Sequence, residues 1–217
     1  MQLTKLTQKL CLNGVKHLPS AQKLSMVKNE DGQVELYMVD TDLNIFVANL
    51  KTFTFRRLID LSTSLGKIRP ADKIVRIMHV NPVTRRLYLA LADSTLLPVI
   101  DLTKSILEWK LPSMQACGVP LAITSDSDKV LLAYDSNKIA VFDTINMRLH
   151  DWTKKHFDKM PENFLDRYNR IIGMTMISDS KVMLYTNYTY SVLDLNAPVP
   201  KEVDLIPNHP SKTLDGR

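Results

Sequence analysis

Four copies of one pattern repeat along the 217-residue chain. Each copy has an apolar run, a short polar turn and a second apolar run, and it ends on a polar residue that starts the next turn. The closing residues are Asn49, Asp101, Asp143 and Asp194, which are spaced 52, 42 and 51 residues apart. Two apolar runs separated by a few turn-forming residues are typical of a β-hairpin. Hairpins that recur about every 40–45 residues, with loop insertions between them, predict the blades of a WD40-like β-propeller.

The third copy shows the pattern most clearly. Val130–Tyr134 and Ile139–Phe142 are apolar throughout, so we expect both strands to be buried on both faces. Arg148–Trp152 alternates polar and apolar residues, as expected of an outer strand whose charges discourage pairing with other chains. This change from buried to exposed strands across one small sheet favours a propeller blade.

A further apolar strand precedes each copy, and an outer strand follows the first three. We therefore predict an all-β fold with about 3.5 to 4 four-stranded blades, which form an incomplete propeller within residues 1–200. The blades are expected at residues 21–62, 72–115, 119–156 and 170–200, the last without its outer strand, and residues 201–217 are expected to form a flexible tail. Propellers usually close with about four to eight blades, so we expect either a fragment or a ring that is completed by residues from elsewhere.

One segment departs from the β pattern. Pro161 suits the first position of a helix, and Phe164, Leu165 and Tyr168 then fall on one face. We expect one short helix near Pro161, either capping the propeller rim or contacting a partner.

Several classes of protein are disfavoured by the sequence. No stretch approaches the roughly 18 apolar residues of a membrane helix, and the N-terminus has no signal-peptide core, so we expect neither a membrane partner nor secretion. Cys11 and Cys117 are expected to be reduced and buried. Metal-ligand spacing, a Gly-rich phosphate loop and the Gly-x-Ser-x-Gly pattern are all missing, so we expect no catalytic, cofactor or metal site and no small-molecule substrate.

Acidic residues recur in the turns, where Asp commonly caps the local backbone. We interpret Asp40, Asp42, Asp93, Asp101, Asp135 and Asp143 as turn formers. A propeller enzyme remains an alternative. The first strands, which line the channel of a propeller, would offer it Ser25, Arg76, His79 and Thr124, without a cluster of carboxylates.

Basic residues cluster in one part of the chain. The net charge is +5, and residues 51–86 contain nine Lys and Arg against Asp60 and Asp72 only. Candidate binding residues are Arg56, Arg57, Lys67 and Arg69, together with Lys154 and Lys155. Such a cluster can follow a phosphate backbone, contact an acidic protein or protect an edge strand, and all three explanations stay open. Arg56 and Arg57 are adjacent, so a strand would point them to opposite faces.

A set of motifs in the second half resembles a known family. A strand ends in Asp151-Trp152-Thr153-Lys154-Lys155, a spacer follows at Met160–Leu165, and the last hairpin leaves through Leu193–Pro200 with its prolines. Residues 129–200 thereby resemble the C-terminal propeller of the cirhin family, the fourth of the U3 small nucleolar RNA-associated proteins. Members of that family are longer, with a whole propeller before this region, which fits a fragment. Trp152 is expected to be packed, with the two lysines in water.

The resemblance implies a non-catalytic scaffold subunit of the small-subunit processome in the nucleolus of the nucleus. That assembly engages the 5′ external transcribed spacer of the ribosomal RNA precursor and is needed to mature the 18S RNA. The implied partners are other propeller and helical subunits of the processome, and the 5′ external transcribed spacer of the precursor RNA is a further candidate. The alternative is an unrelated interaction propeller, such as a coat, nuclear-pore or signalling adaptor, that does not bind RNA.

Overall fold

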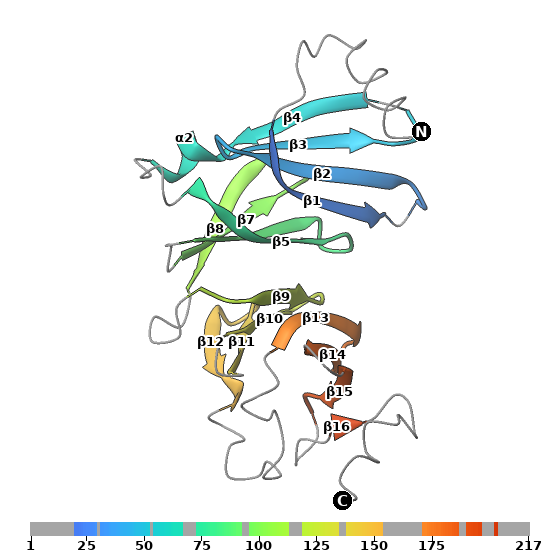
Figure 1. Ribbon diagram of the computed structural model, residues 1–217, viewed down its shortest axis with the longest axis vertical. Helices are drawn as coiled ribbons and strands as arrows, with labels where there is room; N and C mark the ends of the chain where they lie inside the picture. The colour runs from blue at the N-terminus through green and yellow to red at the C-terminus, as the bar shows by residue number, and fades with distance from the viewer. Residues whose placement is uncertain are drawn as a thin grey trace, which may run out of the picture. The chain divides into compact units, whose positions relative to one another are not determined.

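The computed structural model describes residues 20–29, 31–52, 54–66, 73–92, 96–112, 119–134, 138–153, 171–186, 190–196 and 202–203. Its strands form four antiparallel sheets of four strands each, so the predicted all-β class is confirmed (Figure 1). The chain divides into two compact units, residues 1–123 and 124–217. Each unit is described by itself below.

The first unit contains two sheets. The first sheet consists of β1 (Ala21–Lys28), β2 (Val34–Asp40), β3 (Asn44–Asn49) and β4 (Thr54–Asp60), and the second of β5 (Val75–Asn81), β6 (Arg86–Leu91), β7 (Leu96–Asp101) and β8 (Ile106–Pro112). In both sheets the strands lie side by side in chain order. A shared core of buried side chains joins the two sheets; it includes Tyr37, Val39, Ile45, Val47, Val80, Leu87, Leu89 and Ile100.

The strand register assigns each side chain of the first sheet to one face. Tyr37 pairs with Val47, and Val47 pairs with Arg56, so these residues share the face that contributes to the core. Phe46 pairs with Arg57 on the opposite face. The prediction that Arg56 and Arg57 point to opposite faces is therefore confirmed.

The second unit contains the other two sheets, although β9 begins at Ala122, at the boundary between the units. The third sheet consists of β9 (Ala122–Ser125), β10 (Lys129–Ala133), β11 (Ile139–Asp143) and β12 (Arg148–Asp151), and the fourth of β13 (Ile171–Ser178), β14 (Lys181–Thr186), β15 (Tyr190–Asp194) and β16 (Glu202–Val203). Residues 130–134 are fully buried, whereas β12 alternates exposed and half-buried residues, as predicted. Trp152, directly after β12, is 6 % exposed, so the prediction that it is packed is confirmed.

Two elements differ from expectation. The fourth sheet does have an outer strand, because β16 pairs Val203 with Val192, so the prediction that this strand is missing is wrong. A two-residue strand is too short to show any periodicity in the sequence. A short helix, α2 (Leu61–Leu65), also follows β4, where the Asp60 carboxylate accepts a hydrogen bond from the Thr63 N–H. The helix expected near Pro161, Cys11 and Cys117 lie outside the described residues.

Asx side chains organise the hairpin turns. The Asp101 carboxylate accepts the N–H groups of Thr103 and Lys104 at 2.8 and 2.9 Å, and Asp143 accepts those of Ile145 and Asn146, both at 2.9 Å. Asp40, Asp101 and Asp143 are thereby confirmed as turn formers. Asp42 also lies in a turn, but its carboxylate faces Lys73, while Asp93 and Asp135 lie outside the described residues.

Candidate interaction surface

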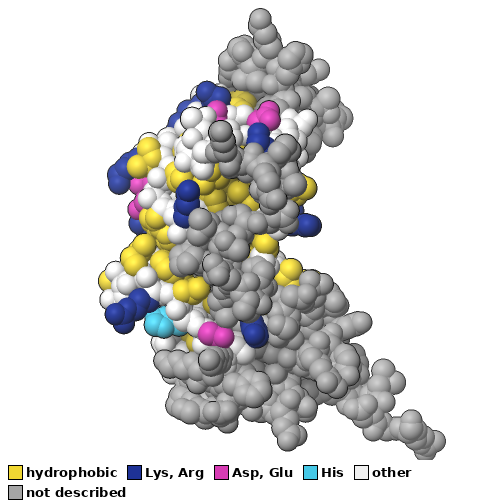
Figure 2. Space-filling model, turned by 90° about the vertical axis from the view of Figure 1, so that its left-hand side faces the viewer, with side chains coloured by type: hydrophobic (Ala, Val, Ile, Leu, Met, Phe, Trp, Pro, Cys, Tyr) yellow, Lys and Arg dark blue, Asp and Glu magenta, His cyan; other side chains and the backbone are white. Residues whose placement is uncertain are grey.

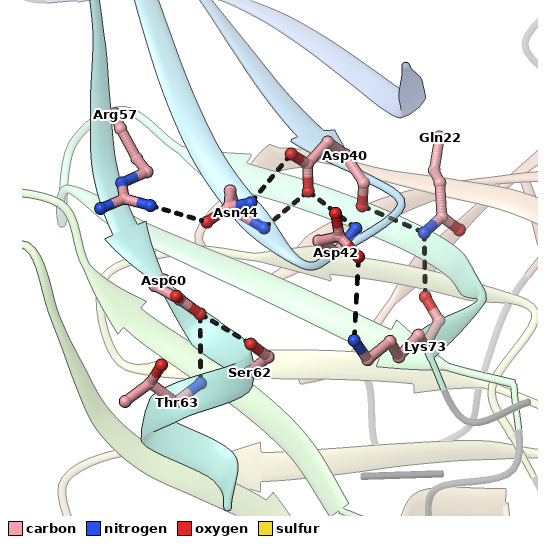
Figure 3. A network of polar contacts seen from close by, with 9 residues as sticks. All are labelled: Gln22, Asp40, Asp42, Asn44, Arg57, Asp60, Ser62, Thr63 and Lys73. Carbon is pink, nitrogen blue, oxygen red and sulfur yellow. Dashed lines mark hydrogen bonds and ion pairs between the residues drawn. The ribbon is translucent and has the colours of Figure 1, made fainter. Parts of the chain in front are cut away.

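The Gln22 side chain connects the two sheets of the first unit through hydrogen bonds (Figure 3). Its Nε2 donates hydrogen bonds to the backbone oxygens of Asp40, in the first sheet, and Lys73, just before β5, at 3.1 and 2.9 Å. Its Oε1 accepts a hydrogen bond from the N–H of Val75, on β5, at 2.9 Å. The β1–β2 register shifts at Gln22, and such a bulge turns a side chain away from its regular direction. The amide therefore reaches the neighbouring sheet.

The buried Asp40 carboxylate begins a chain of contacts that ends at Arg57. Asp40 Oδ1 accepts the N–H groups of Asp42 and Asn44 at 2.9 and 2.8 Å, and its Oδ2 accepts a hydrogen bond from Asn44 Nδ2 at 2.9 Å. Because this fixes the Asn44 amide, its Oδ1 faces Arg57 and accepts a hydrogen bond from Nη1 at 3.3 Å (Figure 3). Arg57 is exposed, and the contact leaves its other N–H donors available to a partner.

A second contact between the two sheets uses Glu35, Tyr37 and Arg85. Arg85 Nη1 donates a hydrogen bond to Glu35 Oε2 at 2.7 Å, and the Tyr37 hydroxyl donates to the same oxygen at 2.9 Å. Burial alone would raise the pKa of Glu35, but the hydrogen bonds from Arg85 and Tyr37 and the positive charge of Arg85 outweigh it and hold the pKa below its ordinary value. Burial raises the pKa of Tyr37 to about 12, so the phenol stays a donor.

The basic cluster seen in the sequence is partly neutralised in the fold. Besides Arg85, Arg86 forms a two-point ion pair with Glu108 at 2.7 and 2.9 Å, and Lys73 lies 3.9 Å from Asp42. The carboxylates of Glu35, Glu108 and Asp42 all lie outside residues 51–86. Counting charges within the segment therefore overestimated its number of unpaired positive charges. On the face shown in Figure 2, the coloured Lys and Arg side chains lie in separate places.

The predicted site residues are only partly placed by the structure. Arg56 and Arg57 lie together on β4, the outer strand of the first sheet, and both are exposed. Lys67, Arg69, Lys154 and Lys155 fall outside the described residues. Sequence reasoning missed Asn44, which orients Arg57, and Gln22, because neither a bulge nor a side-chain contact between sheets leaves a sequence pattern.

The residues offered by the enzyme alternative have packing roles where the structure shows their contacts. The His79 ring stacks on Tyr88 with ring centroids 5.8 Å apart, and burial lowers the pKa of His79 to about 4. In the second unit, Thr124 Oγ1 accepts a hydrogen bond from the N–H of Met176, which joins β9 to β13. Within the described ranges, no three His, Cys, Asp or Glu side chains are grouped as metal ligands. Nor does any described helix have the length and apolar character needed to cross a bilayer.

No protein-family model and no curated protein matches the sequence. Solved structures match the fold. Sqt1 of Saccharomyces cerevisiae matches with a TM-score of 0.58 and 12% identity, over 83% of this chain and 47% of Sqt1. A chain of the mitotic checkpoint complex matches with a TM-score of 0.54 and 11% identity, over 85% of this chain and 54% of that one. The computationally designed protein Ika4 matches with a TM-score of 0.52 and 14% identity, over 82% of this chain and 92% of Ika4.

These similarities agree with the four blade-like sheets, and the fold is that of a WD40-like β-propeller. The chain spans about half the length of the Sqt1 and checkpoint chains that it matches. At identities of 11–14%, the comparisons identify the fold alone.

Proposed function

We propose that this chain is a non-catalytic scaffold that holds other macromolecules on the surface of propeller blades. The observation that carries the proposal is that the polar side chains of the first unit either connect its two sheets or face solvent. Gln22, Glu35 and Arg85 bind across the two sheets, while Arg57 is presented to solvent by Asn44. An enzyme would instead direct such groups toward a substrate site.

More specifically, we propose a scaffold subunit of the small-subunit processome, which acts in precursor ribosomal RNA processing and 18S RNA maturation in the nucleolus. The resemblance of residues 129–200 to the cirhin family, above all Trp152 and the proline-bearing exit after Asp194, supports this role. Trp152 is buried at the end of an outer strand, and the corresponding strand of the family also ends in a tryptophan.

The partners proposed are other processome subunits, and the ribosomal RNA precursor through the assembly as a whole. Direct contact of this chain with RNA has less support, since ion pairs neutralise Arg85 and Arg86 of the basic segment. A phosphate backbone is bound best by several unpaired cations along one path.

Affinity purification of the tagged chain from cells tests the role. Recovery of U3 RNA together with processome proteins is the expected result, and it should survive replacement of Arg86 by Lys, which keeps the charge. Recovery of coat, nuclear-pore or signalling proteins without U3 RNA would refute the processome role and favour the alternative of an unrelated interaction propeller. That alternative shares every feature of the fold and differs only in its partners.

A further inference from the structure

The outer strand β4 differs from the three other outer strands of the described sheets. An outer strand presents unpaired backbone N–H and C=O groups, and proteins protect it by making it short, by a β-bulge, or by placing proline or charged side chains in it. β12 has four residues and β16 has two, while β8 ends on Pro112. β4 has seven residues and no proline, and the described sheets place no strand on its outer side. Its charges come from Arg56 and Arg57 alone among Thr54–Arg57, so this edge discourages most strands but suits one that carries the opposite charge.

The regular part of β4 is short and well defined. Thr54, Phe55, Arg56 and Arg57 pair in unbroken register with β3, and the register shifts only beyond Arg57. A strand added to this edge would therefore pair over these residues, with both arginines at the end next to the register shift.

Arg56 and Arg57 are placed so that together they can recognise the order of side chains on an added strand. They occupy opposite faces of the sheet, so a ligand that follows one face meets only one of them. Successive side chains of an added strand also point to opposite faces, and cross-strand neighbours lie about 4.5–5.5 Å apart. Two consecutive acidic residues on the added strand would meet both arginines, whereas acidic residues separated by one position would meet only one.

The two guanidinium groups are available for such pairing. Both side chains are exposed, and Arg57 is already oriented by Asn44 at 3.3 Å. The positive charge of Arg56 helps to lower the pKa of Glu35, whose carboxylate is engaged by Arg85. Arginine binds carboxylates through paired N–H donors, and this geometry strengthens the contact.

We propose that β4 binds an extended acidic segment of a partner protein as an additional strand, and that the segment carries two consecutive acidic residues opposite Arg56 and Arg57. Backbone hydrogen bonds to the strand edge supply affinity, and the acidic pair fixes the register. RNA is the less favoured ligand, because a phosphate backbone would have to cross the sheet edge to reach both arginines. The inference rests on the proposed scaffold role, but its test does not depend on which assembly the chain joins.

The probe is a short, fluorescently labelled peptide rich in Thr and Val, with two consecutive Glu at its centre. Its matched control has the same composition, with one Thr between the two Glu. Fluorescence anisotropy with the whole chain should show binding of the first peptide at least about fivefold tighter than the second. Replacing a central residue of the first peptide with Pro removes a backbone donor and should weaken binding further. Hydrogen exchange should slow at the amides of Thr54–Arg57 when the peptide is bound.

Variants of the chain locate the site. Combining Arg56→Glu with Arg57→Glu should weaken binding of the first peptide at least about tenfold, a loss that corresponds to about 1.4 kcal/mol of binding free energy. Arg56→Lys with Arg57→Lys keeps the charge without the paired donors and should give an intermediate loss. Lys110→Glu with Arg148→Glu reverses two exposed charges on the outer strands β8 and β12 and should change binding by less than about twofold. Circular dichroism confirms that each variant is folded.

Each other outcome overturns the proposal. Equal binding of the two peptides would mean attraction by charge alone, and no binding of either would leave β4 without this role. Equal losses in the β4 variant and the control variant would place the contact elsewhere. If single-stranded RNA binds and the Arg56/Arg57 reversal abolishes that binding while the peptide does not bind, the edge is an RNA surface. Purification of processome subunits despite a negative peptide result would leave the proposed function standing and refute only this inference.

Discussion

Replacement of Gln22 by Ala tests how the two sheets of the first unit are held together. The substitution removes three hydrogen bonds, of 3.1, 2.9 and 2.9 Å, to the backbones of Asp40, Lys73 and Val75. At about 1 kcal/mol each, they predict a loss of about 3 kcal/mol in the free energy of unfolding. The cost is concentrated at Val75, which is 3% exposed, because its N–H would be left without the partner it has now.

Urea denaturation measures this loss. The chain contains two tryptophans, Trp109 in the first unit and Trp152 in the second, so a Trp152→Phe background makes fluorescence report on the first unit. Gln33→Ala is the matched control, since Gln33 accepts one hydrogen bond, from Asn49 Nδ2 at 2.8 Å within the first sheet, and should cost about 1 kcal/mol. A loss below about 0.5 kcal/mol for Gln22→Ala, or one equal to the control, would refute the role of Gln22 as the connection between the sheets.

The Gln22→Glu variant adds a test based on the direction in which the free energy of unfolding changes with pH. The introduced carboxylate can still accept from the Val75 N–H, but its second oxygen faces the carbonyl oxygens of Asp40 and Lys73. This repulsion raises the pKa of the introduced group above its unfolded value of about 4.3, so the folded state binds more protons. Relative to Gln22→Ala, the free energy of unfolding of Gln22→Glu should therefore rise as the pH falls from 7 toward about 4.3. A flat difference would show that the side chain does not face the two carbonyls.

Three further predictions concern stability. Trp152→Ala should cost about 3–5 kcal/mol by denaturation because the indole is buried, and unchanged stability with loss of a partner would make Trp152 an interface residue instead. Because the pKa of His79 is about 4 in the fold against about 6.5 unfolded, acid should destabilise the protein by about 2 kcal/mol at pH 5 relative to pH 7, and His79→Phe should remove that dependence on pH. Glu35→Gln should cost about 1–2 kcal/mol at pH 7, and a double-mutant cycle with Arg85→Met should give a coupling energy above about 0.5 kcal/mol; an additive cycle would contradict the ion pair.

The repeats made the sheets predictable from sequence. Hairpin strands and turn-forming Asp residues are local signals, and the structure places Asp101 and Asp143 at turns as expected. The helix α2 was missed, although Asp60 before it and Gly66 after it are typical helix boundaries and such a signal is readable. The outer strand β16 was not readable, because two residues carry no periodicity.

The candidate site was predictable only in part. Adjacent arginines on a strand must face opposite ways, so the placement of Arg56 and Arg57 on opposite faces of β4 followed from local rules, whereas the exposure of both did not. The number of unpaired positive charges did not follow from local rules, because the partner of Arg85 lies 50 residues away and that of Arg86 lies 22 residues away. Such ion pairs form only when the sheets assemble, and a count of charges along the chain cannot detect them.

The order of strands within each sheet has an evolutionary consequence. Every sheet pairs strands that follow one another directly, so one sheet corresponds to one uninterrupted stretch of coding sequence. Such a stretch can be duplicated or lost without changing the strand order of the other sheets, provided that new contacts form to the next sheet. In the first unit that junction includes an amide with three backbone contacts, at Gln22, and in the second it includes a hydroxyl contact at Thr124. The two junctions differ in chemistry although the strand order is the same, so a gained blade would need junction contacts of its own.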